Sequence, residues 1–344
     1  MVGIGLIGAG RIGKLHASTI RRAQNCRLVA VYDEQRASAE TLTSIVGGTV
    51  CDHVDALIDN PAVDAVFVCS PTDTHVDMVT LSARAGKAVF CEKPIDLDIA
   101  RVLHCVSVLE QHPVPFAMGF HRRFDPHHRE MYDEIRRGRI GQIEQIHFVS
   151  RDPAPPPLAY IQRSGGIFRD MMIHDLDQCR FILGEELDSL FATGSVLVDP
   201  QIGTSGDFDT VTATLWTSTG VSCTIQNSRR CSYGFDQRIE VFGSKGSIAL
   251  GNVPLTQTCA FGDTGLVKPT LPRHFPQRYH DAYDRQLAAF VDTVTKGTVL
   301  CATALDGLWA LVLADAAERS VRTGQLVRIA DRTSPYDRSD ARRK

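Results

Sequence analysis

The first 120 residues alternate short apolar runs with longer amphipathic stretches. The apolar runs, such as 64–69 and 87–91, are rich in valine and alanine, and segments of helix length separate them. Strands that are apolar on both sides lie in a sheet covered on both faces, so this alternation predicts βαβ units and a parallel sheet. In such a sheet the nucleotide crevice lies at the carboxyl ends of the strands. The expected strands are 3–7, 27–32, 64–69, 87–91 and 114–118, and the expected helices are 11–23, 35–46, 73–85 and 97–111.

The pattern changes after residue 120, and a proline-rich stretch at 153–157 interrupts regular structure. From 188 to 260 the chain runs strand, turn, strand, with glycine in several turns, which predicts an antiparallel meander with one face on helices. The expected strands are 143–150, 188–198, 208–217, 221–229, 236–242 and 246–250, and the expected helices are 125–137, 171–183, 279–296 and 303–322.

Length and composition are those of a soluble protein of two domains, with 344 residues, 43% hydrophobic and 22% charged. We expect a dinucleotide-binding domain over 1–120, a second α/β domain over 121–330 and a charged, mobile tail over 331–344. The net charge of −3 gives no reason to expect nucleic acid or an anionic membrane as partner. No apolar run approaches the roughly 20 residues of a membrane span, and no signal peptide is recognisable at Met1.

The ten cysteines are scattered, and none forms a Cys-x-x-Cys pair. Several lie inside apolar runs, as Cys69 and Cys91 do, which is typical of reduced thiols in a protein core. The chain is therefore expected to be cytoplasmic, without a disulfide framework and without a metal site.

A glycine motif, Gly8-Ala9-Gly10-Arg11-Ile12-Gly13, joins the first expected strand to the first expected helix. Gly8 permits a tight turn, Gly10 lets a pyrophosphate approach the backbone, and Gly13 lets helix and strand pack closely. Arg11 and Ile12 share this loop, whose helix N-terminus attracts phosphate. Asp33 ends the second strand, where a carboxylate binds the adenosine ribose and repels a 2′-phosphate. The motif predicts NAD as cofactor; the alternative is a glycine turn with an acidic helix cap, and Arg36 nearby leaves NADP open.

A second loop, Cys69 to His75, follows the third strand and is expected to lie along the cofactor. Ser70 and Thr72 are candidate cofactor contacts in this loop. His75 either touches the dinucleotide or simply belongs to the helix that follows.

Glu92-Lys93-Pro94 stands at the carboxyl end of the strand 87–91, which faces the crevice where nicotinamide is expected. A lysine there is well placed to donate to a substrate oxygen, and Pro94 is a candidate for a cis peptide bond. The alternative is a surface lysine before a helix.

The segment Gly165 to Asp175 carries a second group of candidates. Asp170 and His174 are four residues apart and share a face if the helix begins here. A histidine oriented by a carboxylate is the usual general base near neutral pH. The alternatives are a helix cap with an ion pair, or a metal site made of Asp170, His174 and Asp175, the less favoured of the two because no cysteine or second histidine has ligand spacing.

Together, the glycine motif, Glu92-Lys93-Pro94 and the 165–175 segment resemble the Gfo/Idh/MocA oxidoreductases. Within that family the motifs are most similar to those of bacterial inositol 2-dehydrogenases. Further matches are Gly119 to Asp125, Tyr233 to Arg238 and Arg278 to Tyr283, and the resemblance extends to about residue 329.

The resemblance implies a Rossmann domain followed by an α/β domain with a large, open, mostly antiparallel sheet that commonly forms a tetramer interface. It also implies that Lys93, Asp170 and His174 form the catalytic group. Glu92 and Tyr283 join the cofactor site by the same resemblance. It places His121, Arg122, Asp152 and Tyr233, with the catalytic group, around the substrate.

The implied reaction is NAD-dependent oxidation of a secondary hydroxyl of a cyclic polyol, most simply myo-inositol to 2-keto-inositol. Phe235 stands where many inositol-active relatives have tyrosine, and His121 occupies a variable pocket position. Scyllo-inositol, glucose-type sugars and anhydro-sugars therefore stay open as substrates, with NAD or NADP. A dinucleotide-binding sensor without catalysis is the alternative from another class, although a sensor has no need of an acid–base set.

Overall fold

The computed structural model describes residues 1–263 and 265–329, and these form two compact units. The first unit consists of Met1–Arg129 and Tyr279–Trp309, and the second of Glu130–Arg278 with the described residues from Ala310 to Ile329. This division differs from the predicted one, because the segment from Tyr279 to Trp309 packs with the dinucleotide-binding unit instead of with the second domain. The predicted tail at 331–344 lies outside the described residues.

The first unit contains a six-stranded sheet in the order β3-β2-β1-β4-β5-β6, with every neighbouring pair parallel. Strands β1, β4 and β5 are buried along their whole length, as the continuous apolar runs predicted. The strand order reverses between β1 and β4, which is where doubly wound sheets bind ligands. The strands are β1 (Val2–Ile7), β2 (Cys26–Tyr32), β3 (Thr49–Val50), β4 (Ala65–Val68), β5 (Ala88–Cys91) and β6 (Phe116–Met118).

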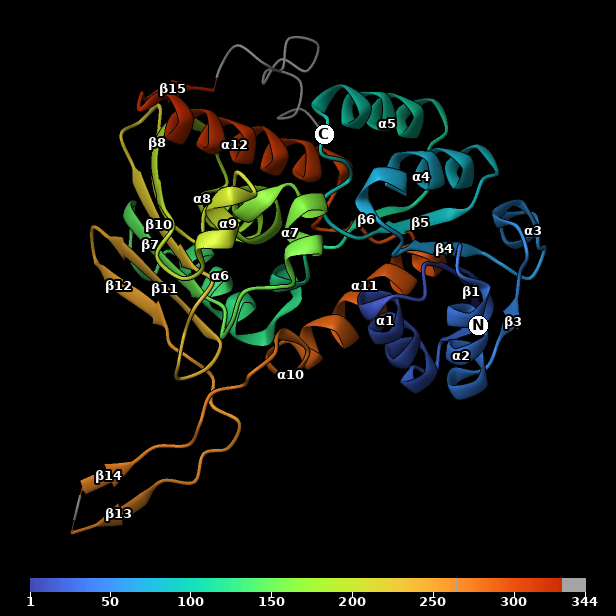
Figure 1. Ribbon diagram of the computed structural model, residues 1–344, viewed down its shortest axis with the longest axis horizontal. Helices are drawn as coiled ribbons and strands as arrows, with labels where there is room; N and C mark the ends of the chain where they lie inside the picture. Colours follow the sequence, from blue (N-terminus) through green and yellow to red (C-terminus); the bar gives the residue numbers. More distant parts are fainter. Residues whose placement is uncertain (264, 330–344) are drawn as a thin grey trace. The chain divides into compact units, whose positions relative to one another are not determined.

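Helices cover both faces of this sheet, with α4 and α5 on one face and α1, α2 and α11 on the other (Figure 1). Leu287, Phe290 and Val291 of α11 belong to the same core cluster as Phe67 and Phe90 of the sheet. That burial explains why a segment near residue 290 belongs to the first unit. The helices of the unit are α1 (Arg11–Arg22), α2 (Arg36–Val46), α3 (Val54–Ile58), α4 (His75–Arg84), α5 (Ile99–Gln111), α11 (His280–Lys296) and the short 3₁₀ turns η1 (Thr72–Thr74) and η2 (His121–Phe124).

The second unit contains a seven-stranded sheet in the order β12-β11-β7-β10-β9-β8-β15. The predicted meander is wrong at one point, because β7 lies between β10 and β11 and runs parallel to β10. All other neighbouring pairs are antiparallel. The strands are β7 (Ile143–Arg151), β8 (Leu187–Ser195), β9 (Thr210–Thr217), β10 (Ser222–Ser228), β11 (Asp236–Gly243), β12 (Gly246–Leu250) and β15 (Val327–Arg328).

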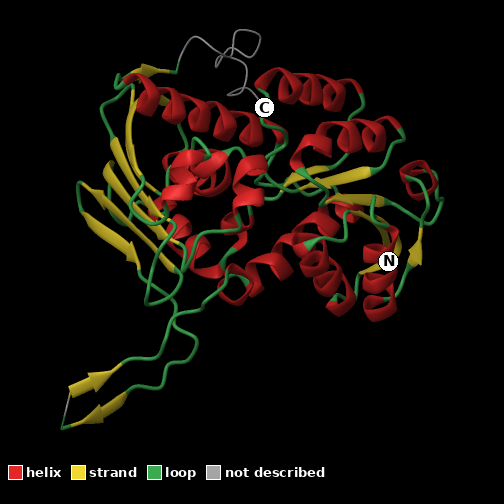
Figure 2. Cartoon of the chain, viewed as in Figure 1, coloured by secondary structure: helices red, strands yellow, loops and turns green. Residues whose placement is uncertain are grey.

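Helices gather on one face of the seven-stranded sheet (Figure 2). Strand β9 shows why: Val211, Ala213 and Leu215 are buried, whereas Thr212 and Thr214 on the alternate face are half-exposed. The helices are α6 (Pro126–Arg136), α7 (Leu158–Ser164), η3 (Phe168–Met172), α8 (Ile173–Leu183), α9 (Pro200–Thr204), α10 (Phe275–Arg278) and α12 (Ala304–Thr323). Helix α12 begins in the first unit and continues into the second.

A small hairpin of β13 (Ala260–Gly262) and β14 (Gly265–Val267) extends away from the seven-stranded sheet of the second unit (Figure 1). It was not predicted, because three-residue strands leave no periodic signal. Across the described ranges, no helix combines the length and the apolar character needed to cross a bilayer, and no disulfide links the cysteines.

Candidate active site

The glycine loop after β1 is shaped as the motif predicted. Gly8 has φ +98°, and a Cβ there would lie 2.5 Å from the Cys69 carbonyl and the Ser70 nitrogen. A Cβ on Gly13 would lie 1.9 Å from the Gly8 oxygen, so this glycine permits the close contact between helix and loop. Gly10, the N-cap of α1, faces open space, and no side chain caps the helix. Arg11 and Ile12 form the first turn. The loop therefore fits a dinucleotide pyrophosphate, held by backbone N–H groups.

Asp33 joins the end of β2 to this loop. Its Oδ2 accepts a 2.6 Å hydrogen bond from the Ala9 nitrogen, and its Oδ1 accepts one of 2.8 Å from Gln35. Each carboxylate oxygen keeps a second lone pair with which to accept from a ribose hydroxyl. Arg36, which left NADP open, is paired with the carboxylates of Glu40 and Asp52. This pairing offsets the positive charge that a 2′-phosphate would need.

Replacing Asp33 with alanine is expected to raise the KM for NAD about tenfold or more and to relax discrimination against NADP. The physical reason is the loss of a charge-assisted acceptor, whose hydrogen bonds stabilise by roughly 1.5–3 kcal/mol. The measurement is kcat/KM with each dinucleotide at a fixed polyol concentration. Asp64→Ala is the matched control, because Asp64 accepts a 2.7 Å bond from the Gly3 nitrogen at the opposite end of β1. An unchanged ratio between NAD and NADP would refute the role given to Asp33.

His75 connects the loop that follows β4 to the loop that follows β5. The His75 ring is buried, with Nδ1 2.8 Å from the Pro94 oxygen and Nε2 2.8 Å from the Ser70 oxygen. Burial lowers the pKa of His75, although both carbonyl contacts act in the opposite direction. Because its two nitrogens are engaged, the geometry favours the structural alternative for His75 over direct contact with a dinucleotide. Ser70 shares a 2.7 Å hydrogen bond with Thr74, and Thr72 opens the turn η1.

Lys93 follows β5 at the carboxyl edge of the sheet, and the Lys93–Pro94 peptide bond is cis. The Lys93 nitrogen donates to Glu92 Oε2 at 3.2 Å, and the lysine is half-buried. Glu92 is buried and its Oε1 lies 2.7 Å from His16 Nε2. The same carboxylate thus joins α1, the helix of the glycine motif, to the backbone of Lys93.

His16 was not predicted as a functional residue. Its ring contacts Phe67, Phe90 and Tyr283 edge-on, with centroids 4.9–5.5 Å apart. The available signal was a polar residue on the apolar face of α1, between Gly13 and Ile20. Alone, such a residue does not reveal its partner.

His121 and Arg122 lie in the turn η2 after β6 and are buried. The His121 ring stacks on Tyr283 with centroids 4.8 Å apart, and its Nδ1 lies 3.5 Å from the Tyr283 hydroxyl. Burial, reinforced by the charges of Arg122 and Lys93, holds the pKa of His121 well below its ordinary value. His121 is therefore a neutral group close to Lys93, within the same unit.

Asp170 and His174 do not share the one regular α-helix that the sequence predicted. Residues Phe168–Met172 form a π-helical turn, and α8 begins after it at Ile173. Asp170 thus lies in the π turn and His174 in the first turn of α8. Single π turns inside helices occur frequently at functional sites.

Close approach of the backbone and hydrogen bonds hold this segment. Gly166 has φ +80°, and a Cβ there would lie 2.7 Å from Asp207 Oδ1. The same Asp207 oxygen accepts from the Ile167 nitrogen at 3.0 Å. Tyr160 of α7 donates its hydroxyl to Asp170 Oδ1 at 2.8 Å. Tyr160 was missed, because nothing in its sequence surroundings marks it as a partner of Asp170.

Asp175, next to His174, is fully buried. It accepts hydrogen bonds of 2.7 Å from Ser150 Oγ of β7 and from Asn227 Nδ2 of β10. These bonds attach α8 to two neighbouring strands, so they give Asp175 a structural role beside the proposed base.

The remaining substrate candidates of this unit lie near the start of β11. The exposed Tyr233 donates to Asp236 Oδ2 at 2.6 Å, and Arg151 Nη1 donates to both. Burial would raise the pKa of Asp236, but hydrogen bonds from Arg238, Tyr233 and Asn252 lower it. Asp152 is half-buried after β7, and its nitrogen donates to the Ser228 oxygen.

Comparisons with known proteins identify the family of both units. A family model described as an oxidoreductase family with an NAD-binding Rossmann fold matches residues 2–120, and a GFO/IDH/MocA C-terminal domain model matches residues 128–249. The chain is 48% identical over 332 residues to the inositol 2-dehydrogenase of Rhizobium meliloti, a match that covers 96% of this chain and 99% of that protein.

Two solved structures are also similar. The myo-inositol dehydrogenase of Corynebacterium glutamicum is 38% identical, with a TM-score of 0.91 over 95% of this chain and 98% of that one. The scyllo-inositol dehydrogenase of Lactobacillus casei, solved with NAD(H) and scyllo-inositol, is 30% identical, with a TM-score of 0.90 over 96% of this chain and 99% of that one.

Proposed function

This chain belongs to the GFO/IDH/MocA family of NAD-binding oxidoreductases, and from that premise we propose that it oxidises myo-inositol to 2-keto-inositol. The observation that carries the proposal lies within the first unit. There the glycine loop after β1 and Lys93 after β5 are both at the carboxyl edge of one parallel sheet. An ammonium group at that edge suits a reaction on a hydroxyl more than simple storage of a dinucleotide.

The proposed roles follow from the residue types. Lys93 donates to the substrate oxygen as it gains alkoxide character, where a cationic donor stabilises more than in the ground state. An imidazole nitrogen of His174 takes the hydroxyl proton, and Asp170 orients that ring and offsets its developing charge. NAD, when bound, supplies the carbon that accepts the hydride.

The substrate assignment is supported by the relatives. The Rhizobium meliloti protein, which is named an inositol 2-dehydrogenase, is 48% identical, whereas the scyllo-inositol enzyme of Lactobacillus casei is 30% identical. Neutral His121 can both donate to and accept from polyol hydroxyls, a property that suits a substrate with hydroxyls on every carbon. We propose Arg122, Asp152 and Tyr233 as further substrate contacts.

We further propose that the enzyme works as a homotetramer in the cytoplasm. The tetramer is supported by the seven-stranded sheet, which has helices on one face (Figure 2). Its other face carries the half-exposed Thr212 and Thr214 of β9. Light scattering coupled to size exclusion gives the mass directly, and a monomer of 37.8 kDa would refute the tetramer.

The testing experiment is a substrate panel scored by NADH absorbance. It contains myo-inositol, scyllo-inositol, glucose and an anhydro-sugar, each with NAD and with NADP. We expect the highest kcat/KM for myo-inositol with NAD. Turnover of glucose or the anhydro-sugar alone would replace inositol by a sugar as substrate. NAD binding without turnover of any of the four would favour a sensor.

A further inference from the structure

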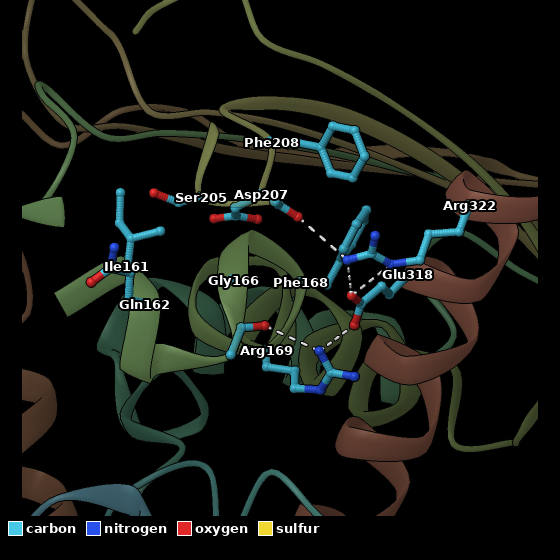
Figure 3. Close-up of a pocket in the computed structure, with 12 residues that line it drawn as sticks. Ile161, Gln162, Gly166, Phe168, Arg169, Ser205, Asp207, Phe208, Glu318 and Arg322 are labelled. Atoms are coloured by element: carbon cyan, nitrogen blue, oxygen red, sulfur yellow. Dashed lines mark hydrogen bonds and ion pairs between the residues drawn. The ribbon is translucent and has the colours of Figure 1, made fainter. Parts of the chain in front are cut away.

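The π turn that carries Asp170 is attached to a distant helix by the residue before it, Arg169. Arg169 Nε and Nη2 lie 2.8 and 2.6 Å from Asp315 Oδ1 on α12, and Nη1 pairs with Glu318 Oε2. Nη1 also donates to the Gly165 oxygen at 3.1 Å. Figure 3 shows the guanidinium between the π turn and α12.

The contacts form a largely buried charge cluster. The side chains of Arg169, Asp315 and Glu318 are 17%, 18% and 21% exposed. Burial would raise the pKa of Glu318, but hydrogen bonds from Arg322 and the charge of Arg169 lower it below its ordinary value. A planar guanidinium that contacts two carboxylates and a carbonyl oxygen fixes its orientation as well as its distance.

Apolar packing holds part of the π turn, because the side chains of Phe168, Met171 and Met172 are buried. A cavity of about 200 Å³ borders it and is lined by Gly165, Gly166, Phe168 and Arg169, with Asp207 and Arg322 across from them (Figure 3). On the side of the pocket the turn makes fewer dispersion contacts than a fully packed segment would. On this side the polar contacts of Arg169 add a directional restraint to the apolar packing of the turn.

We propose that Arg169 is a positioning residue that fixes Asp170 for catalysis by attaching the π turn to α12. Successive side chains of a helical turn diverge, so an anchored Arg169 sets the direction in which Asp170 leaves the backbone. Tyr160, on Asp170 Oδ1, restrains the carboxylate itself. The inference rests on the proposed function, because it assumes that Asp170 orients the ring of His174.

The test compares Arg169→Met, Arg169→Lys and Arg322→Met. Arg322 is the control, because it pairs with the same Glu318 but is half-exposed and lies outside the π turn. In Arg169→Met we expect kcat to fall roughly 100-fold, the effect of misplacing a catalytic group by about 1 Å, with the KM for polyol and the Kd for NAD within threefold of wild type. Arg169→Lys is expected to restore part of kcat, and Arg322→Met to stay within twofold.

Hydrogen–deuterium exchange over residues 167–174 supplies a readout that needs no turnover. Arg169→Met is expected to exchange faster there than wild type or Arg322→Met. Equal exchange in all three proteins would overturn the inference, even if no polyol is turned over and the proposed function fails. If the wild-type enzyme turns over a polyol and Arg169→Met has the same kcat, the inference about Arg169 is wrong while the proposed function stands. If Arg169→Met does not fold, Asp315→Asn weakens the same attachment and takes its place in both measurements.

Discussion

Replacing Lys93 with methionine is expected to lower kcat by about 100- to 1,000-fold, the range for loss of a donor to a developing oxyanion. Methionine keeps the length and apolar stem of lysine but has no charge and donates no hydrogen bond. The Kd for NAD is expected to change less than threefold, because the glycine loop and Asp33 are untouched. Steady-state kinetics and a fluorescence titration of NAD separate the two effects.

The control for this variant lies at the other end of β5. Lys87 precedes β5 at its amino end and donates to the carbonyl oxygens of Asn60 and Val63 at 3.2 and 2.7 Å. Lys87→Met removes a lysine of the same unit that lies away from the carboxyl edge of the sheet. At temperatures below the melting temperature of the variant, its kcat is expected to match that of the wild type. Equal loss in the two variants, or full activity in Lys93→Met, would remove Lys93 from the mechanism.

His174→Asn is expected to lower kcat by about 100- to 10,000-fold, since a positioned general base contributes that much. Asparagine retains hydrogen-bonding ability but cannot accept the hydroxyl proton at neutral pH. The residual rate is expected to climb steadily with pH, because hydroxide then replaces the missing base. A pH series of kcat for both proteins checks this.

His274→Asn, at an exposed position before α10 in the same unit, is the matched control and is expected to behave like wild type. A His174→Asn enzyme that keeps the wild-type pH profile would show that another group takes the proton.

The first unit was largely predictable, because its strands are buried on both faces and its helices are long and amphipathic. Two short elements, β3 and α3, were missed, since two to five residues carry no periodicity. In the second unit β7 to β12 were located and the short strands β13, β14 and β15 were missed; the predicted order was wrong where β7 lies between β10 and β11. Periodicity does not reveal that β10 pairs with β7 across about 75 residues of chain.

The candidate site residues could be proposed from the sequence as far as its motifs extend. The glycine loop, Lys93, Asp170 and His174 stand in short segments whose residue types indicate their chemistry. Their supporting partners were not predictable: His16 meets Glu92 across 76 positions, and Arg169 meets Asp315 across 146. Such contacts are created by tertiary packing, and the π turn itself depends on contacts that no local preference specifies.

The packing of α11 against the first sheet limits how this protein can be divided. A gene fragment that stops near residue 129 would encode all six strands but would leave Phe67 and Phe90 without the aromatic cover of Phe290. Truncation would therefore yield an aggregation-prone polypeptide instead of a portable nucleotide module. A chimera that grafts this module onto another substrate domain must carry two separate stretches of chain, with the new domain inserted between them.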